Sequence, residues 1–346
     1  MVAAQEPLPI ENIQLRGDRF HGLNYGEMTA EQRALLYNVV NSARAVTNTT
    51  GNGPFNVLLR SPQVGELSQQ LGNAIRFSSG LSGRQREIAT LMAGRSWTST
   101  YEWYAHARYA LDEGIDAAVV AAIAAHRTPD LAAMPAEDAM VWRIADELLY
   151  TRRVTDTTYG EALAVLGERR LFSVATITAY YEYVSMLLNV DRYPLPADAP
   201  AGAAAAARAV RALPAAQLYR EPRSRVTQRA PIPNEDTERA VAALGEAIYR
   251  EANLPALARD EVRKAVLRQW NRPRRERDEP LPISRPAAIA LKFAAELLRT
   301  RVVSDATFAA ARDTLGERGL VDLMVLMGHS NIRCAQQALA GADCAL

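Results

Sequence analysis

The sequence predicts an all-α protein that contains part of one helical bundle twice. Apolar residues recur at helical spacing along most of the 346 residues, and strand-like alternation is nearly missing. In addition, ADELLYTRRVTDTTYGEALAVLGERRL, starting at Ala145, returns as AAELLRTRVVSDATFAAARDTLGERGL, starting at Ala294. The register is constant, since Gly316 follows Gly167 by 149 residues (316 − 167). Duplication of a helical hairpin is the simplest explanation.

The first half of the chain is predicted to form eight helices: 29–45, 63–76, 82–96, 99–113, 116–127, 136–150, 156–166 and 170–188. The third begins with Ser82 and Gln85, the spacing of a capping box that satisfies the free amides of a helix's first turn. Ser99 and Glu102 repeat this pattern at the start of the fourth. Gly114 then supplies a left-handed C-terminal cap.

The composition changes after Pro196. PLPADAPAGAAAAARAVRALPAAQ is rich in alanine and bounded by proline, and the proline- and arginine-rich YREPRSRVTQRAPIPNED follows it. These changes predict three parts: a helical domain with the active site over 1–196, a linker over 197–236, and a degenerate second repeat over 237–346. The helices expected near 238–252 and 258–270 carry no histidine, so we expect one active site per chain.

The composition also excludes several classes of partner. With a net charge of +1 and a pI near 7.8, the overall charge does not attract the chain to nucleic acid or to an anionic membrane. The arginine-rich run from Arg268 to Pro280 contains acidic residues and prolines, which favours a solvated loop over an RNA contact. MVAAQEPLPIEN, at the N-terminus, lacks the basic start and apolar core of a secretory signal.

The two cysteines and the longest apolar stretch give the same picture. Cys334 and Cys344 match no disulfide framework and no zinc-ligand spacing, and a reducing cytosol suits them. LFSVATITAYYEYVSMLL contains Glu182 and several hydroxyl residues, which favours a buried core helix over a membrane span. We therefore expect a cytoplasmic protein with no membrane or nucleic-acid partner.

One dense cluster of reaction-capable side chains lies on two consecutive predicted helices: Glu87, Arg95, Trp97, Ser99, Glu102, Trp103 and His106. Glu102 and His106 are four residues apart, so they project from one helix face. A histidine both takes and returns a proton near neutral pH, and a buried glutamate relays it. These residue types indicate an acid–base pair.

The segment YEWYAHARYALDEG, after REIATLMAGRSW, resembles the carboxymuconolactone decarboxylase family, which includes the alkylhydroperoxidase D branch. The likeness extends over about residues 28–196, through GPFNVLLRSPQVGELSQQLGNAIRF and ADELLYTRRVTDTTYGEALAVLGE. It implies an alkylhydroperoxidase D-like helical bundle, here duplicated with a degenerate C-terminal copy. Glu87 and His106 match the family's glutamate and histidine positions.

The resemblance also selects a branch of the family. Glu102 and Trp103 fit the non-peroxidase branch, whereas peroxidase members carry a Cys-x-x-Cys at the positions that are Ser99 and Glu102 here. The implied activity is that of a decarboxylase-type lyase, isomerase or dehydratase, without cofactor or metal, on a small oxygenated organic acid, lactone or enone. A thiol peroxidase is not expected.

The implied roles follow from this activity. His106 is the general acid and base, Glu87 relays the proton and Glu102 assists. Arg95 neutralises Glu87 or anchors a substrate carboxylate. The remaining candidates form the walls of a substrate pocket: Trp97, Trp103 and Tyr181. Tyr180 and Tyr183 lie on the same helix as Tyr181, and position alone does not choose among the three.

Simpler readings stay open for single residues. Glu102 is a plain capping residue if it forms a capping box with Ser99. Independently, Arg95 is a structural partner of a nearby carboxylate. The tryptophans are core residues when each is considered alone. His126, at a helix end, is explained by a charge interaction with the helix dipole. His329 occupies the repeat position of Tyr180, either as a remnant of a pocket or as a partly exposed structural residue.

Two further alternatives concern the whole protein. It is either an enzyme or a non-catalytic member that keeps the fold for binding or assembly. A metal-dependent variant would use Glu87, Glu102 and His106 as ligands. Single-domain members of the resembled family form rings built from dimers, so the duplicated chain is expected to form a homotrimer.

Overall fold

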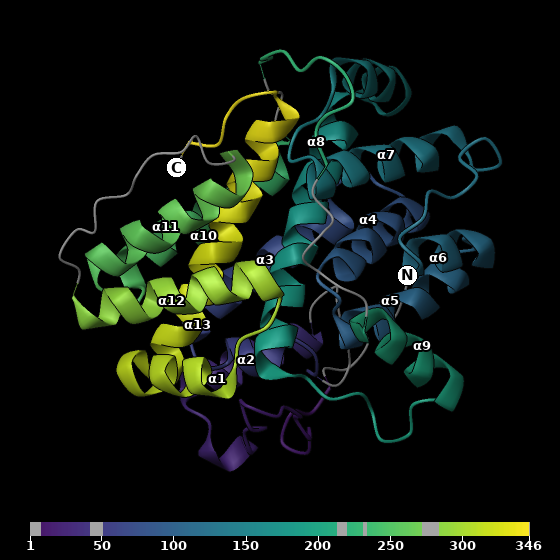
Figure 1. The fold of residues 1–346 in the computed structure, drawn as a ribbon. Coiled ribbons are helices and arrows are strands. Elements are labelled where there is room, and N and C mark those ends of the chain that lie inside the picture. Colours follow the sequence, from purple (N-terminus) through teal and green to yellow (C-terminus); the bar gives the residue numbers. More distant parts are fainter. Residues whose placement is uncertain (1–7, 42–50, 213–219, 231–233, 272–283, 346) are drawn as a thin grey trace.

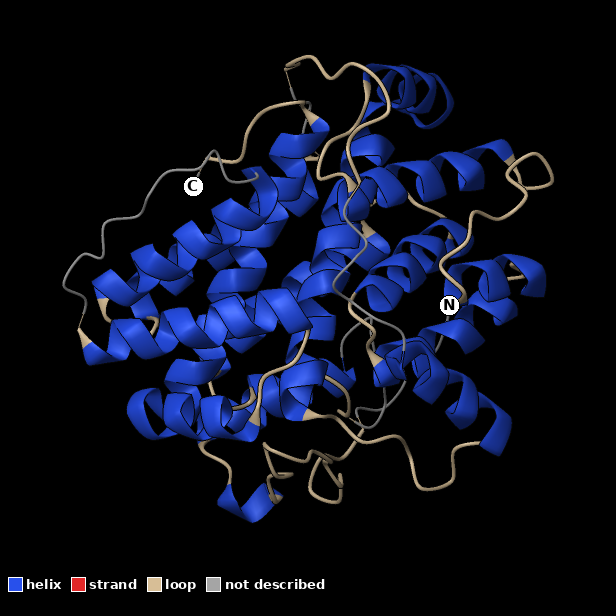
Figure 2. Cartoon of the chain, in the orientation of Figure 1, coloured by secondary structure: helices blue, strands red, loops and turns tan. Residues whose placement is uncertain are grey.

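The computed structural model describes residues 8–41, 51–212, 220–230, 234–271 and 284–345. All regular secondary structure in these ranges is helical, as Figure 2 shows, and the predicted all-α class is confirmed. The elements, labelled in Figure 1, are η1 (Tyr25–Glu27), α1 (Ala30–Asn41), α2 (Phe55–Leu58), α3 (Pro62–Phe77), α4 (Gly83–Ser96), α5 (Thr100–Asp112), α6 (Ala117–Ala124), α7 (Ala136–Tyr150), α8 (Asp156–Asp191), α9 (Ala201–Ala212), α10 (Glu235–Glu251), α11 (Ala256–Asn271), α12 (Arg285–Thr300) and α13 (Asp305–Leu339).

Most helices of the first half begin and end close to the predicted residues. α7 has the predicted bounds, and α4 begins with both hydrogen bonds of the Ser82–Gln85 capping box. The two helices predicted on either side of Gly167 are continuous in α8, with a kink at this glycine (φ 73°, ψ 165°). The part of the first predicted helix beyond residue 41 lies outside the described residues.

The predicted capping box at the start of α5 does not form. Ser99 is the N-cap residue, but its hydroxyl accepts no hydrogen bond from the helix, and the Glu102 side chain is directed at His106 instead. Glu102 is therefore not a plain capping residue. Gly114 does take the left-handed conformation (φ 78°) that was predicted for the end of this helix.

The structure repeats the helical hairpin that the sequence repeats. Gly316 kinks α13 (φ 70°, ψ 170°) as Gly167 kinks α8, and Ser304 caps α13 as Thr155 caps α8. The two long helices pack against each other in the middle of the molecule (Figure 1). Around them, α4 packs on α7 and α8, and α11 packs on α12 and α13 in the same way.

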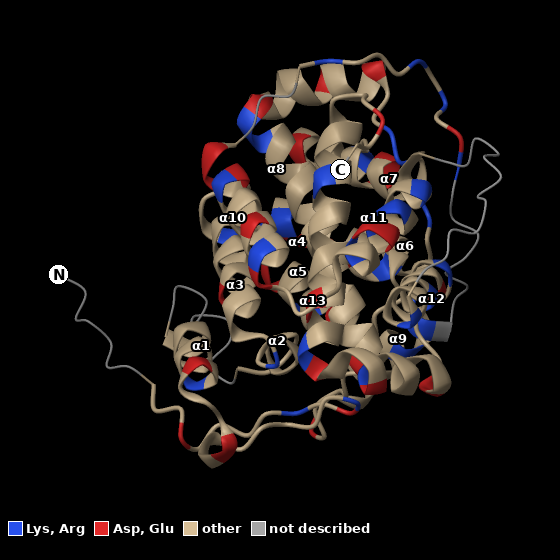
Figure 3. Cartoon of the chain, turned by 90° about the vertical axis from the view of Figure 1, so that its left-hand side faces the viewer, with Lys and Arg blue, Asp and Glu red and all other residues tan. Residues whose placement is uncertain are grey.

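The segment predicted as a linker contains regular structure. α9 lies within it and packs on α5, and α10 begins at its end and packs on α3. The division at residues 196 and 236 stays a prediction. Of the arginine-rich run, residues 272–280 lie outside the described residues. On the side seen in Figure 3, basic and acidic residues are mixed along α10 rather than segregated.

By length and composition, one of the described helices, α8, could cross a membrane, but its apolar window is entirely buried inside the fold. The sequence predicted a buried core helix here rather than a membrane span, because the apolar stretch contains Glu182. The burial of this stretch agrees with that prediction.

The expectation for the cysteines was wrong. Cys334, on α13, and Cys344, beyond its end, form a disulfide with their Cα atoms 4.8 Å apart. Gly341 (φ 69°) turns the chain just after α13, which brings Cys344 back beside the last turns of the helix. The bond therefore fixes the C-terminal segment to α13.

Candidate active site

His106 lies between two carboxylates from two helices. Nδ1 of His106 lies 2.5 Å from Oε2 of Glu87, which α4 supplies, and Nε2 lies 3.1 Å from Oε1 of Glu102, one turn earlier on α5. All three side chains are buried, and His106 is the most accessible at 8 % exposure. The structure thus brings together the three residues predicted as catalytic.

Arg76 and Tyr181 complete this cluster. Arg76, in the last turn of α3, contacts Oε1 of Glu87 through Nη2 at 3.4 Å and donates from Nη1 to the Tyr181 hydroxyl at 2.5 Å. The Tyr181 ring meets the His106 ring edge-on, with 5.1 Å between centroids. Of the three candidate tyrosines, Tyr181 is the one beside His106, since Tyr180 and Tyr183 bond to Ser68.

The electrostatics of the cluster favour an ionised Glu87. Burial alone would raise the pKa of the Glu87 carboxyl, but His106, Arg76 and Arg86 outweigh burial and lower it. Tyr181 and Glu87 in turn raise the pKa of Arg76. A carboxylate at Nδ1 fixes the imidazole orientation and presents Nε2 to Glu102. Nε2 and the Glu102 carboxylate therefore face each other at 3.1 Å.

Arg76 was absent from the sequence predictions, and Arg95 does not neutralise Glu87, which was one of its two predicted roles. Arg95 Nε donates to the backbone oxygen of Ala124 at 2.8 Å, and burial lowers its pKa. It contacts neither Glu87 nor another carboxylate among the described side chains. The one sequence signal for Arg76 is its place at the end of GELSQQLGNAIRF, the segment similar to the family's lead-in.

Trp97 and Trp103 are core residues. Both are buried in the hydrophobic core, at 1 % and 3 % exposure. Trp97 Nε1 donates to Oε1 of Glu182 at 3.1 Å, within a polar network in the middle of the molecule. The structure therefore does not place Trp97 beside His106. Both tryptophans fit the simpler interpretation that each one is a core residue.

The expectations for two other histidines need correction. His126 is left-handed (φ 54°), and burial together with Arg95 and Arg220 lowers its pKa to about 4, so it is neutral near pH 7 and has no charge to interact with a helix dipole. His329 is buried rather than partly exposed, and burial lowers its pKa to about 4. In the second copy of the repeat, Ser330 stands at the position that corresponds to Tyr181 in the first.

No metal site is evident in the described part of the chain, where no group of three or more His, Cys, Asp and Glu side chains could hold an ion. In the His106 cluster, each imidazole nitrogen faces a carboxylate directly. The metal-dependent alternative therefore finds no support in this geometry.

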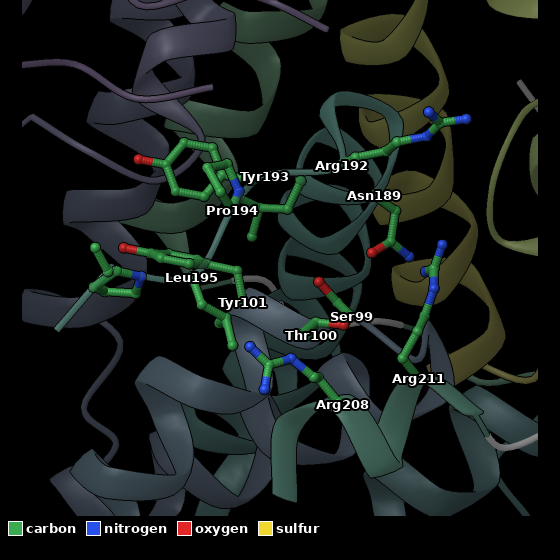
Figure 4. A pocket seen from close by; sticks show the side chains of 13 residues that line it. Ser99, Thr100, Tyr101, Asn189, Arg192, Tyr193, Pro194, Leu195, Arg208 and Arg211 are labelled. Carbon is green, nitrogen blue, oxygen red and sulfur yellow. The ribbon is translucent and has the colours of Figure 1, made fainter. Parts of the chain in front are cut away.

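A cavity of about 520 Å³ lies at the start of α5, between the end of α8 and α9 (Figure 4). Its lining residues are Ser99, Thr100, Tyr101, Leu188, Asn189, Arg192, Tyr193, Pro194, Leu195, Pro196, Ala197, Arg208 and Arg211. Ser99 begins the helix face that continues through Glu102 to His106, so the cavity and the His106 cluster share α5.

Comparison with known proteins adds one finding. Residues 62–146 match the model of the carboxymuconolactone decarboxylase family, which covers about a quarter of the chain and includes Arg76, Glu87, Glu102 and His106. Searches of curated proteins and of solved structures found no match.

Proposed function

Residues 62–146, from α3 into α7, belong to the carboxymuconolactone decarboxylase family, and on this premise we propose that the protein is an enzyme of proton transfer. The proposed reaction is loss of carbon dioxide, a double-bond shift or loss of water next to a carbonyl of a small organic acid, lactone or enone. The observation that carries the proposal is the buried His106 with a carboxylate at each ring nitrogen. The proposed reaction needs no cofactor, because each of its three forms passes through an enol-like species. An acid–base pair can form this species and protonate it again.

Each member of the cluster has a role in this proposal. Glu87, held by Arg76, orients the imidazole through Nδ1 and stabilises the imidazolium that forms when His106 takes a proton. Glu102 exchanges the proton with Nε2 and lies one turn from Ser99, which lines the cavity. Ser99, Glu102 and His106 follow one another along one face of α5, so this helix links the cavity to the cluster.

A panel of lactones, unsaturated carboxylic acids and enones tests the proposal, with mass spectrometry as the readout. The purified wild type should convert at least one compound, and His106→Ala should lose the conversion while keeping its helical circular dichroism. His21→Ala, which removes an exposed histidine, is the matched control and should retain activity. Conversion by His106→Ala at the wild-type rate would refute the proposal.

A non-catalytic binding or assembly member is the second candidate. The observation in its favour is the low accessibility of His106, whose two ring nitrogens are both engaged by carboxylates of the same chain. Soaking crystals with carboxylic acid or lactone fragments separates the two. Density beside Glu102 and His106 favours the enzyme, and fragments that never reach them favour the second candidate.

The proposed assembly is a homotrimer of two-repeat chains. In support, Phe77 and Leu111 are about half exposed (50 % and 48 %) on α3 and α5, the helices that hold Arg76 and His106. Packing of these two side chains in a subunit interface would remove their apolar surface from water. Light scattering should give three times the chain mass, and a monomeric mass would exclude the trimer.

A further inference from the structure

The cavity at the start of α5 has the chemistry of an anion site, and we infer that it binds a small organic oxyanion, either a carboxylate or a phosphate ester. The inference rests on the proposed function in one respect, namely that the anion is the molecule on which His106 acts. Binding itself does not depend on turnover. It is carried by three features: the start of α5, the Ser99 hydroxyl, and two arginines from α9.

The start of α5 supplies donors and a partial positive charge. The first amides of a helix have no partner within it, and the helix dipole favours an anion there. Ser99 caps this 13-residue helix without a side-chain hydrogen bond. Ser99 is fully buried and lines the cavity. Its Oγ has no hydrogen-bond partner among the described residues. A buried hydroxyl without a partner points to a ligand that the cavity receives.

Glu102 does not neutralise this end of the helix for a ligand in the cavity. It is the acidic residue of the first turn, but its carboxylate contacts His106 and is not part of the cavity lining. No aspartate or glutamate occurs among the described residues that form the wall. The cavity is therefore open to a negatively charged group.

Two arginines of α9 supply the full positive charges. Figure 4 shows Arg208 and Arg211 on either side of the Ser99 hydroxyl. Among the described residues, Arg211 Nη1 donates to the backbone oxygen of Thr98 alone, at 3.4 Å, while burial and the nearby Arg192 lower its pKa. Arg208 is exposed and has no hydrogen bond or ion pair with a described residue.

Arg192 differs from these two, although it lines the same cavity. Its Nη2 pairs with Oδ1 of Asp305 at 2.6 Å, and Figure 4 shows its guanidinium directed away from Ser99. The Asp305 carboxylate, which Arg19 shares, compensates part of the Arg192 charge. Among the described lining residues, the cations directed at Ser99 are therefore Arg208 and Arg211, both from a helix within the segment predicted as a linker.

The opposite wall is aromatic and apolar. Tyr101 and Tyr193 contact each other edge-on, with 4.6 Å between ring centroids, and Pro194 lies beside them. Tyr193 donates its hydroxyl hydrogen to Oδ1 of Asn52, which leaves its ring as the face toward the cavity. A flat organic group carrying one oxyanion matches a cavity with this division between charged and apolar walls.

Isothermal titration calorimetry with two probes, inorganic phosphate and benzoate, tests the inference, with sodium chloride at matched ionic strength as the blank. At least one probe should bind saturably. Tighter binding of phosphate would identify the ligand as a phosphate ester, and tighter binding of benzoate would identify it as a carboxylate. Arg208→Ala and Arg211→Gln should each weaken that binding roughly ten- to a hundredfold, because each removes a charge-assisted hydrogen bond.

Two further variants keep the result interpretable. Ser99→Ala removes a hydroxyl without a partner, so the fold should persist while binding weakens several-fold. Arg239→Ala removes an exposed arginine of α10 outside the cavity and should leave binding unchanged. No saturable binding of either probe by the wild type, or equal affinities in Arg208→Ala, Arg211→Gln and Arg239→Ala, would overturn the inference.

His106→Ala distinguishes this inference from the proposed function. It should bind the probe like the wild type, because His106 does not line the cavity. If this variant binds normally and also keeps turnover, the proposed function fails and the anion site stands. If turnover depends on His106 while neither probe binds to the wild type, the anion site fails and the proposed function stands.

Discussion

Glu182 and Asn331 occupy the same position in the two copies of the repeat, and they hydrogen-bond to each other in the middle of the molecule. Asn331 Nδ2 donates to Oε2 of Glu182 at 2.9 Å across a separation of 149 residues, the repeat offset. Each residue also accepts from an indole: Trp97 donates to Glu182 at 3.1 Å, and Trp270 donates to Asn331 at 2.8 Å. The contact marks the approximate two-fold axis that relates the copies.

The arginines around this axis follow the same symmetry. Arg152 and Arg301, 149 residues apart, are both left-handed at the end of a helix (φ 55° and 64°). The guanidinium of Arg152 lies over the Trp270 ring at 4.6 Å, and that of Arg301 lies over the Trp97 ring at 4.5 Å. Each copy thus reaches across to the tryptophan of the other, which supports the duplication beyond the repeated hairpin.

Glu182→Gln should destabilise the protein by about 3 to 5 kcal/mol, because it leaves the buried Arg152 guanidinium without its carboxylate. Urea unfolding followed by circular dichroism measures the change. Glu161→Gln breaks the partly exposed pair with Arg143 and should cost no more than about 1 kcal/mol. Equal losses in the two variants would show that the central pair is not a special contributor.

Gly316→Ala should cost about 1 to 3 kcal/mol, because the kink in α13 needs a φ of 70° with a ψ of 170°, a conformation that residues with a Cβ avoid. The position is sterically open, so backbone strain is the sole cause. Gly160→Ala, at another open position inside α8, should instead gain up to about 1 kcal/mol. A stable Gly316→Ala would mean that the kink is dispensable.

His329→Gln should reduce the decrease in the free energy of unfolding that the wild type shows as the pH falls below 7. Burial and the neighbouring Arg333 lower the pKa of His329 from 6.5 to about 4 in the folded protein. Between these values the unfolded chain binds a proton that the folded chain does not, so the free energy of unfolding falls as the pH falls. Urea titrations at pH 7 and pH 4.5 should differ less for the variant than for the wild type. Equal differences would contradict the buried, neutral state of His329.

Replacing both cysteines, Cys334→Ser with Cys344→Ser, should lower the free energy of unfolding by about 2 to 3 kcal/mol, the value expected for closing a short loop. The wild type in dithiothreitol should match this variant in urea unfolding. Should the reduced wild type be as stable as the oxidised protein, the disulfide would have no part in holding the C-terminal segment on α13.

The sequence predicted the reactive pair because its geometry is local. Glu102 and His106 are one turn apart on a helix, and the motif places Glu87 on the preceding helix. The role of Arg76 could not be predicted in this way, because it depends on where the last turn of α3 lies relative to Glu87 on α4 and Tyr181 on α8. Arg95 does not neutralise Glu87 because it lies eight residues further on, about 12 Å along the helix axis and on a different face.

Two similar patterns also gave different structures. Ser82 with Gln85 forms a capping box, whereas Ser99 with Glu102 does not, because Glu102 has His106 as an alternative partner and Ser99 faces a cavity. The disulfide needed the turn at Gly341, which cysteine spacing does not reveal. Local patterns therefore specified the helices and the reactive pair, and tertiary contacts determined the surroundings of the site.

The most direct test of His106 as the proton-transfer residue is exchange of a substrate proton with solvent. With a compound that the wild type converts, deuterium from heavy water should enter the carbon beside the carbonyl, and NMR measures its rate. His106→Gln should slow this exchange by about 10² to 10⁴-fold, the usual contribution of a general acid–base residue, while keeping the folded helical spectrum. Exchange at the wild-type rate in folded His106→Gln would contradict the account.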